Sequence, residues 1–427
     1  MKNKKALGLL ILGGTIRYIL MTSKYSSSIS GRVEISTPLN SYKRVQEGVY
    51  LYKNQIDPYQ GDMVHETPLV LLSLAWASST IPLLVPWIYI MIDLAAAFIL
   101  YKMSTEFINQ MFAKQSREKG QYADETDELH LKLQDTIDIP KFVFIAYLMN
   151  PLTILNCVGL SSTVFSNFFL ALCFFFMAKH KLWPCLAILA LETMRNLYPV
   201  VFIAPIMLVF GKSCTKEYVK VAARFLFLCF GFCYISYAIM GSWTFLNGTL
   251  GFVFFCRELQ PNIGLFWYFF MEMFDHFRTL FLITFQINAT ILYLIPLTFK
   301  LHKDPLMLTT ILISLTSIFR SYPCLGDIAF YLAFLPLWRR CWKFMAHNFV
   351  VFCFFLITLL IMPALWYLWM YAGSANANFY FGATLAFSTG QIFLVTDLLF
   401  AYVKREFCLK YGQKVFIDGK EAKIILE

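Results

Sequence analysis

Apolar runs separated by short polar segments recur from one end of the chain to the other. Several runs are shorter than the ~20 residues that cross a bilayer unaided, so we expect those helices to be broken or held by neighbouring helices. The pattern predicts an all-α polytopic membrane protein with about twelve membrane-spanning helices. The predicted spans lie at roughly 6–22, 84–104, 141–158, 161–179, 182–194, 196–211, 219–241, 270–299, 306–320, 326–337, 345–371 and 379–403.

Composition supports the same class. Hydrophobic residues make up 59% of the 427 residues and charged residues 15%, whereas soluble proteins carry about 25% charged residues. The net charge of +10 could indicate nucleic acid, but the basic residues stand in short clusters between apolar runs, as in membrane proteins. We therefore expect no nucleic acid among the partners.

The basic clusters predict an orientation. Those after residues 180, 211, 298, 337 and 402 fall on the same side of the predicted membrane as the basic start of the chain. Because basic loops stay in the cytosol, we predict both termini to be cytosolic and the 23–83 loop to be luminal. A helix within that loop starts at a proline and is expected to lie along the membrane surface.

Two segments are predicted to lie outside the bilayer. Within the membrane domain of 1–403, residues 105–140 carry mixed charges and are expected to form a mobile cytosolic loop. In the cytosolic tail of 404–427, Asp418-Gly419 stands between short apolar stretches, which predicts a small β-hairpin. No chemistry is expected from the hairpin.

The stretch from 266 to 288 reads as a span but places four ionisable residues near its start: Glu272, Asp275, His276 and Arg278. At helical spacing Glu272 can pair with His276, and Asp275 with Arg278. The residues could form a self-paired, half-hydrated cluster or a polar wall for a lipid head group. Acid–base chemistry is less favoured, because nothing nearby supplies a nucleophile or a metal site.

Further polar groups are predicted to face the lumen between spans. Each group alone could be an ordinary turn, and we interpret "MRNLYP" at 194–199 in this way. A site is indicated because several such groups are predicted on the same side of the membrane. Paired asparagines offer donors and acceptors without charge, which suits sugar hydroxyls or phosphate oxygens. The candidate residues are His65 and Glu66, then Arg320, Tyr322 and Asp327, and finally Asn376 and Asn378.

Arg17 and Asp93 are lone charges in two neighbouring apolar runs. Because an unpaired charge in a bilayer is costly, we expect the two side chains to pair with each other. We interpret this pair as structural.

The 11 cysteines indicate neither a disulfide framework nor a metal site. Most lie in apolar runs, and no C-x-x-C or Cys/His ligand spacing is present. Cys256 and Cys324 are the only plausible luminal thiols, and each is expected to be a packing residue. The sequence therefore predicts no metal, no cofactor and no catalytic cysteine in this chain.

Five motifs follow one another across nearly the whole chain: "DPYQGDMVHETPL", "LMNPLTILNCVGLSSTVFSN", "GLFWYFFMEMFDHFRTLFLITFQIN", "SYPCLGDIAFYLAFLPLW" and "LWYLWMYAGSANANFYFGATLAF". Together they resemble the PIG-U family, the U subunit of the glycosylphosphatidylinositol (GPI) transamidase. The resemblance is least at 23–50 and 105–140.

The resemblance implies a fold similar to the polytopic lipid-sugar mannosyltransferases of the endoplasmic reticulum, a GT-C-type bundle. Those enzymes use luminal acidic residues soon after the first span, commonly an Asp-x-Asp-like pair. This chain has only the isolated Glu34 and Glu47 there, which indicates a scaffold that has lost its chemistry and kept a lipid-glycan cleft. Asp57 or Glu66 could still be recruited, so a lipid-linked mannosyltransferase is the alternative, and a transporter or flippase ranks last.

The resemblance also implies a non-catalytic subunit of the GPI transamidase in the endoplasmic reticulum membrane. Its partners would be the protease-like PIG-K subunit, which is expected to carry the catalytic cysteine and histidine, with PIG-T, PIG-S and the GPI-anchor attachment protein subunit. It would bind the GPI lipid and help to admit the carboxy-terminal signal of precursor proteins. The head group is expected to contact Asn376, Asn378, Asp275, His276, Arg278, Arg320, Tyr322, Asp327, His65 and Glu66.

Overall fold

The computed structural model describes residues 3–80, 84–124, 126–211, 214–413, 416–417 and 420–421. The α-helices are α1 (Asn3–Thr22), α2 (Ser26–Ser30), α3 (Tyr42–Lys53), α4 (Pro68–Thr80), α5 (Val85–Glu118), α6 (Leu133–Leu148), α7 (Pro151–Val158), α8 (Thr163–Ala178), α9 (Leu182–Arg195), α10 (Ile203–Phe210), α11 (Thr215–Met240), α12 (Thr244–Leu246), α13 (Phe252–Phe255), α14 (Phe266–Met271), α15 (Asp275–Ile287), α16 (Leu294–Lys300), α17 (Pro305–Phe319), α18 (Leu325–Leu332), α19 (Asn348–Met370) and α20 (Ala377–Tyr411). The 3₁₀ segments are η2 (Lys119–Gln121), η3 (Asp127–Leu129), η4 (Tyr198–Phe202) and η7 (Leu335–Phe344), and the π-helical turns are η5 (Asn247–Gly251) and η6 (Asn288–Leu292). Two short strands, β1 (Phe416–Ile417) and β2 (Lys420–Glu421), pair antiparallel.

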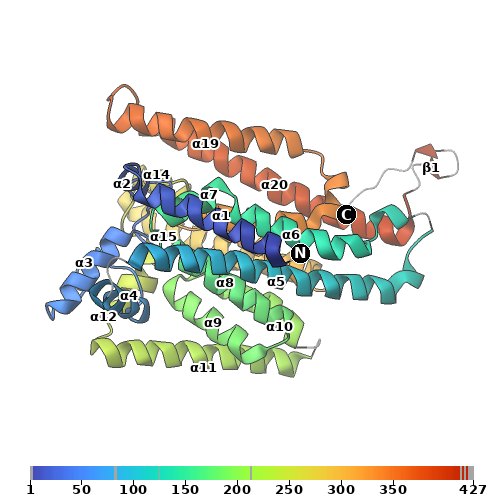
Figure 1. Ribbon diagram of the computed structural model, residues 1–427, viewed down its shortest axis with the longest axis horizontal. Coiled ribbons are helices and arrows are strands. Elements are labelled where there is room, and N and C mark those ends of the chain that lie inside the picture. Colours follow the sequence, from blue (N-terminus) through green and yellow to red (C-terminus); the bar gives the residue numbers. More distant parts are fainter. Residues whose placement is uncertain are drawn as a thin grey trace.

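The longest helices run along the long axis of the molecule, as Figure 1 shows for α5, α11, α19 and α20. In the described part of the chain, 6 helical segments are long and apolar enough to cross a membrane: α1, α5, α11, α15 with α16, α19 and α20. The bent segment from 127 to 158 would make a seventh. These helices support the predicted all-α membrane class, whereas the predicted count of twelve spans is not confirmed.

Several of the remaining predicted spans are short helices in the interior of the bundle. α17 is buried from residue 306 to residue 318. Its Thr309, Ser314 and Ser317 hydroxyls each donate to the carbonyl four residues earlier, so these polar groups need no further partner. A helix that contacts protein on all sides does not have to match the thickness of the lipid.

The predicted mobile loop at 105–140 is wrong over 105–118 and 133–140, which are α-helical. α5 continues through its first half, and this helix of 34 residues is about 51 Å long at a rise of about 1.5 Å per residue. Phe107 and Ile108 are buried in the core, and the Gln110 side chain donates to the carbonyl of Ala178 at 2.6 Å. The last part of the segment belongs to α6. Contacts with distant parts of the chain order this segment, and a charge pattern does not reveal such contacts.

The predicted span at 270–299 is broken near its start. Residues 272–274 separate α14 from α15, and Phe274 is not helical (φ −58°, ψ 135°). Glu272 therefore lies between two helices, so the i,i+4 relation expected between Glu272 and His276 does not hold.

The two ends of the long axis carry different segments. One end holds α2, α3, α4 and the turn between α19 and α20, at the left of Figure 1, and we call it the predicted luminal end. At the predicted cytosolic end, basic loops gather around the second half of α5: Lys179 pairs with Glu106, and Lys114 donates to the carbonyl of Lys303. This gathering agrees with the predicted topology. The side of the membrane that each end faces stays a prediction.

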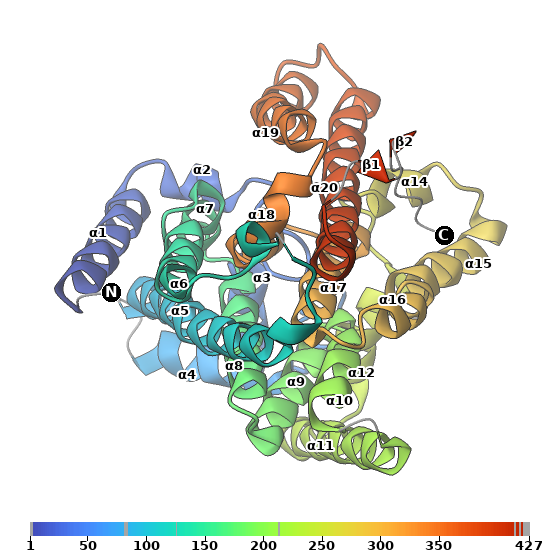
Figure 2. The ribbon, with the colours of Figure 1, turned by 90° about the vertical axis from the view of Figure 1, so that its right-hand side faces the viewer.

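Two smaller predictions concern the first loop and the tail. Pro68 starts α4, and Figures 1 and 2 show this helix lying across the long axis, the direction expected on a membrane surface. In the tail β1 and β2 pair, but Asp418 and Gly419 lie outside the described residues, so the hairpin turn stays a prediction.

The predicted ion pair between Arg17 of α1 and Asp93 of α5 is confirmed. The side chains are 2.7 Å apart and almost fully buried. Arg17 also donates to the carbonyls of Gly13 and Leu148 at 3.1 and 3.0 Å, and Tyr147 donates to Asp93 at 2.8 Å. The pair therefore joins α1, α5 and α6.

Candidate functional site

Two residues that are 110 positions apart in the sequence, each in one of the quoted motifs, meet at the predicted luminal end. Tyr268 of α14 donates its hydroxyl to the side-chain oxygen of Asn378 near the start of α20. The Tyr268 ring stacks on Phe381 with centroids 4.6 Å apart, and Trp267 stacks on Trp369 at 6.2 Å. We call the rings of Trp267, Tyr268, Trp369 and Phe381 the aromatic wall.

Asn376 and Asn378 lie at the exposed edge of the aromatic wall. The Oδ1 atom of Asn376 accepts the backbone N–H of Asn378 at 3.1 Å, so Asn376 caps α20. Among the described residues, neither side-chain N–H₂ group is used in a hydrogen bond. The two residues therefore form a turn and still present two free amide donors to solvent.

Asp275, His276 and Arg278 lie at the exposed start of α15. Arg278 pairs with Asp275 at 2.8 Å, which confirms the i,i+3 pairing expected from the sequence. The Nε atom of Arg278 also donates to the carbonyl of Phe270 at 3.0 Å and so joins α15 to α14. The His276 ring is exposed beside Phe277. A role of this cluster in binding a head group stays a prediction.

A second polar region is buried in the bundle, at the end of α9. Arg195 pairs with Glu66 and with Glu192, each at 3.0 Å, and both glutamates are almost fully buried. The remaining guanidinium N–H groups donate to the Ser166 hydroxyl at 3.1 Å and the Ser162 carbonyl at 3.3 Å. Because every Arg195 donor has a partner, this cluster offsets the cost of taking three charges out of water.

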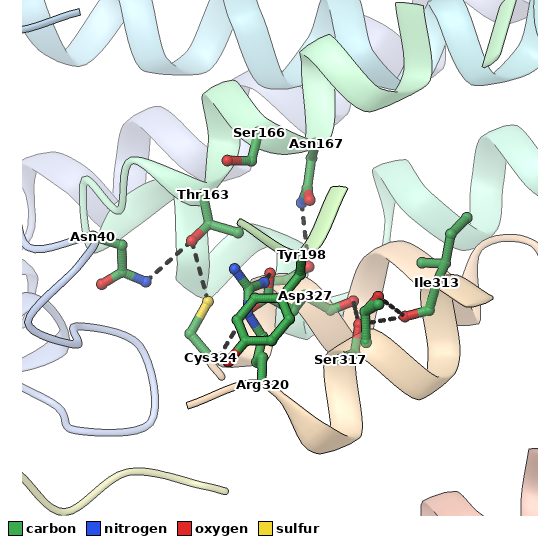
Figure 3. Close-up of polar contacts among 12 residues, drawn as sticks. Asn40, Thr163, Ser166, Asn167, Tyr198, Ile313, Ser317, Arg320, Cys324 and Asp327 are labelled. Atoms are coloured by element: carbon green, nitrogen blue, oxygen red, sulfur yellow. Dashed lines mark hydrogen bonds and ion pairs between the residues drawn. The ribbon is translucent and has the colours of Figure 1, made fainter. Parts of the chain in front are cut away.

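Arg320 and Asp327 form a neighbouring ion pair. The Arg320 guanidinium lies 5.6 Å from the centre of the Tyr198 ring, and Figure 3 shows these three side chains together. Close by, Thr163 lies 3.3 Å from the sulfur of Cys324, which is fully buried. Its surroundings fit the prediction that Cys324 is a packing residue.

Two small cavities adjoin this cluster, each of about 30 Å³ and both lined by Asn196, Arg320 and Asp327. Such a volume holds one or two water molecules and is too small for a sugar ring. The buried Nε of Arg320 and Oδ1 of Asn196 have no partner among the described residues, so we expect water to bond to them. In this conformation the chain's own side chains fill the interior where a head group was expected.

The structure divides the candidate ligands into two groups. The exposed group at the predicted luminal end is Asn376, Asn378, Asp275, His276 and Arg278. The interior group of Glu66, Arg320, Tyr322 and Asp327 lines one small cavity, while His65 bonds to the carbonyl of Gly248 at 2.8 Å and stacks on Phe252. The role of either group as GPI ligands stays a prediction.

Sequence reasoning missed the residue at the centre of the interior cluster. Arg195 and Asn196 belong to the stretch at 194–199 that was interpreted as a turn. A signal was available, because Glu192 stands three residues before Arg195 in an otherwise apolar segment, the spacing of a helical ion pair. The third member, Glu66, is 129 residues away, and no local pattern connects it to them.

Three of the acidic residues that a mannosyltransferase could use, Glu34, Asp57 and Glu66, are engaged with neighbouring groups. Both oxygens of Glu34 accept from Arg32 at 3.1 Å. Asp57 accepts from Thr244 at 2.7 Å and from the N–H of Tyr59 at 2.9 Å. Glu66 is held by Arg195, as described above. In this conformation each of the three carboxylates accepts hydrogen bonds from groups of the chain itself.

His65 makes the stability of the predicted luminal end sensitive to acid. Burial lowers the pKa of the His65 imidazole from 6.5 to about 4, and the nearby Arg44 acts in the same direction. The unfolded chain therefore binds more protons than the folded chain between these pKa values, so stability falls as the pH falls through that window. From about pH 7 to about pH 5 the expected loss is about 2 kcal/mol.

Thermal unfolding in detergent at the two pH values would measure this loss. His65→Gln keeps a polar side chain of similar size and removes the titration, so its unfolding midpoint should fall less on acidification. An equal fall in the wild type and in the variant would contradict the assignment to His65.

Known proteins resemble the chain over nearly its whole length. A family model described as "GPI transamidase subunit PIG-U" matches residues 11–387. The chain is 37% identical over 432 residues to the "GPI-anchor transamidase component PIGU" of Cricetulus griseus, and 36% identical over 435 residues to that of Homo sapiens, with 98% of each chain covered. It is also 28% identical over 381 residues to the "GPI transamidase component GAB1" of Saccharomyces cerevisiae, with 88% of each chain covered.

Proposed function

Because this chain belongs to the PIG-U family of GPI transamidase subunits, we propose that it binds the GPI lipid and presents it to a catalytic subunit elsewhere in the complex. The complex attaches the lipid to the carboxy terminus of a precursor protein from which the signal has been removed. That reaction requires a nucleophile and a base. The protease-like PIG-K subunit would supply both, and PIG-T, PIG-S and the GPI-anchor attachment protein subunit would complete the complex.

The observation that carries the proposal is the aromatic wall with two free asparagine amides at its edge. Amide groups suit sugar hydroxyls and phosphate oxygens, and aromatic rings favour the depth at which a lipid head group meets its acyl chains. Tyr268 donates its hydroxyl to the Asn378 oxygen, which leaves the Asn378 amide N–H₂ group free. Asp275, His276 and Arg278 would add polar contacts at the start of α15.

The buried group has a different role in this proposal. Glu66, Arg320, Tyr322 and Asp327 hold the interior of the predicted luminal end together rather than touching the head group. The cavities of about 30 Å³ beside them support this division.

Two observations support the absence of chemistry from this chain. Glu34, Asp57 and Glu66 are each engaged by neighbouring groups, so a mannosyltransferase would first have to release one of them. The thiols of Cys256 and Cys324 are buried, at 4% and 0% exposure. The chain would act in the endoplasmic reticulum membrane as a multi-pass protein with both termini in the cytosol.

The proposal is tested by removing the two amides while keeping the helix cap. Serine caps a helix as well as asparagine does, so Asn376→Ser with Asn378→Ser should preserve the turn. Because two hydrogen bonds to the lipid are lost, the amount of GPI that co-purifies with the complex should fall by roughly tenfold. The amount of each other subunit that co-purifies should stay unchanged.

Tyr268→Phe is the matched control, because it removes only the hydroxyl that Asn378 accepts and leaves both amides in place. This variant should retain most of its GPI. Unchanged GPI in the serine double variant would contradict the site, and transfer of mannose from a dolichol-linked donor by the purified chain would contradict the proposed function.

A further inference from the structure

Two larger cavities lie at the opposite end of the long axis from the aromatic wall. They measure about 300 and 250 Å³ and flank the second half of α5. Lys114, Lys303 and Asp304 line both, and the Lys114 amine donates to the Lys303 carbonyl at 3.0 Å between them. Figure 2 faces this end, where α5, α17 and α20 come together. We call the two cavities the basic cleft.

Positive charge outweighs negative charge around the basic cleft. Asp304 accepts from the Tyr402 hydroxyl at 3.2 Å, and Glu118 accepts from the Tyr122 hydroxyl at 3.2 Å. Both of these acids therefore already have hydrogen-bond donors. The lining cations are Lys114, Arg117, Lys303, Arg405 and Lys410, and the lining acids are Glu118, Asp304 and Glu406.

Most of the cations form no close ion pair in the described part of the chain, although Lys114 acts on the charges of Asp304 and Glu406 from a greater distance. Among the described residues, only Arg405 of the five forms an ion pair, with Glu406 at 3.1 Å. Lys114, Arg117 and Lys303 are exposed at the mouth of the cleft. A cluster of unpaired cations around a cavity attracts an anion more strongly than isolated surface lysines do.

Arg405 adds a buried cation to the lining of the smaller cavity. It is only 6% exposed, and it donates to the carbonyl of Leu129 at 2.9 Å and to Glu406 at 3.1 Å. Its Nε atom is buried and has no partner among the described residues. An unused buried donor is costly. Because Arg405 lines the smaller cavity, an anionic oxygen bound there would gain a charge-assisted hydrogen bond from its guanidinium.

The larger cavity also has an apolar side. Phe107, Met177, Val209 and Leu306 line it together with the two lysines and the arginine. An apolar wall beside a cationic rim matches a molecule with a phosphate at one end and hydrocarbon at the other.

We propose that the basic cleft binds a phosphate ester, held by the cations at its mouth and by Arg405 inside. The apolar wall favours the head group of a membrane lipid as the source of this phosphate. A soluble phosphate ester has the same recognition chemistry, so the experiment separates the two. This site is independent of the GPI site at the other end of the molecule.

The full chain in mild detergent is titrated with three probes, and binding is followed by native mass spectrometry. Dioctanoyl phosphatidic acid carries phosphate and chains, glycerol 3-phosphate carries the phosphate alone, and dioctanoylglycerol carries the chains alone. We expect the first probe to bind and the third not to bind. Tighter binding of phosphatidic acid than of glycerol 3-phosphate identifies a lipid ligand, and equal binding identifies a soluble ester.

Two double variants remove the same number of exposed cations from this end. Arg117→Gln with Lys303→Gln changes the mouth of the cleft, and Lys181→Gln with Lys216→Gln changes exposed lysines that do not line it. The first should weaken binding of phosphatidic acid by about tenfold, and the second by much less. Equal weakening by both, no weakening by the first, or binding of dioctanoylglycerol as tight as that of phosphatidic acid would overturn the proposal.

Arg405→Lys tests the interior of the cleft. Lysine keeps the positive charge but has no Nε–H at that position and no planar fork. Binding of phosphatidic acid should therefore weaken although the net charge is unchanged. An unchanged affinity would show that the Arg405 side chain does not contact the ligand, and it would contradict a specific site in the cleft.

Discussion

Replacing Arg195 by alanine is expected to prevent most of the chain from reaching a stable folded state. The substitution would leave the carboxylates of Glu66 and Glu192 buried together without a cation. Breaking one buried pair by removing a partner typically costs about 3–5 kcal/mol, and here a single arginine serves two carboxylates. The loss is comparable with the roughly 5–15 kcal/mol by which most proteins are stable.

The fraction of monodisperse protein after detergent purification and the midpoint of thermal unfolding would measure this effect. Arg257→Ala is the matched control, because Arg257 lies near the same end, is exposed and bonds to Asn247. The control should change the midpoint by little. Adding Glu66→Gln and Glu192→Gln to Arg195→Ala should recover part of the loss, because it removes the unpaired negative charge. An Arg195→Ala protein as stable as the control would contradict the assignment.

The second large effect is expected at the ion pair between α1 and α5. Arg17→Ala and Asp93→Ala should each destabilise the chain by about 3–5 kcal/mol, because each leaves its partner charged and buried. The double variant should be less harmful than either single variant, since no charge is then left unpaired. Unfolding midpoints of the wild type, the two single variants and the double variant form a complete thermodynamic cycle.

An exposed pair provides the reference for this cycle. Lys220 and Glu217 lie three residues apart on α11 at 2.6 Å, with both side chains well exposed. Their coupling should not exceed about 0.5 kcal/mol. Additive losses at Arg17 and Asp93 would show that the contact between them contributes nothing to stability, whatever their distance.

Features set by local pattern could be predicted from the sequence. The apolar runs gave helices close to the expected positions, and Pro68 begins α4. Asp275 and Arg278 pair because their spacing on a helix dictates it. The pairing of Arg17 with Asp93 could be predicted because an unpaired charge in a bilayer costs free energy. These two lone charges lie in adjacent apolar runs, where few other charged partners are available.

Features that depend on contacts between distant segments could not be predicted. The break at Phe274 contains no glycine or proline that would signal it. The charges at 105–118 suggested a solvated loop, yet Phe107 is buried and Gln110 bonds to α8. The meeting of Tyr268 with Asn378 likewise depends on tertiary packing, although both residues stood in motifs that the sequence had singled out.

During translation Arg17 is synthesised well before its partners. Asp93 follows 76 residues later, and the carbonyl of Leu148 follows 131 residues later. An unpaired arginine costs up to about 2.5–3.5 kcal/mol to place in lipid, the value for the centre of a helix, and Arg17 lies in the last third of α1. We therefore expect α1 to enter the lipid late. Until α5 and α6 are inserted, its charged Arg17 side chain has to stay in contact with the insertion machinery or with the hydrated edge of the bilayer.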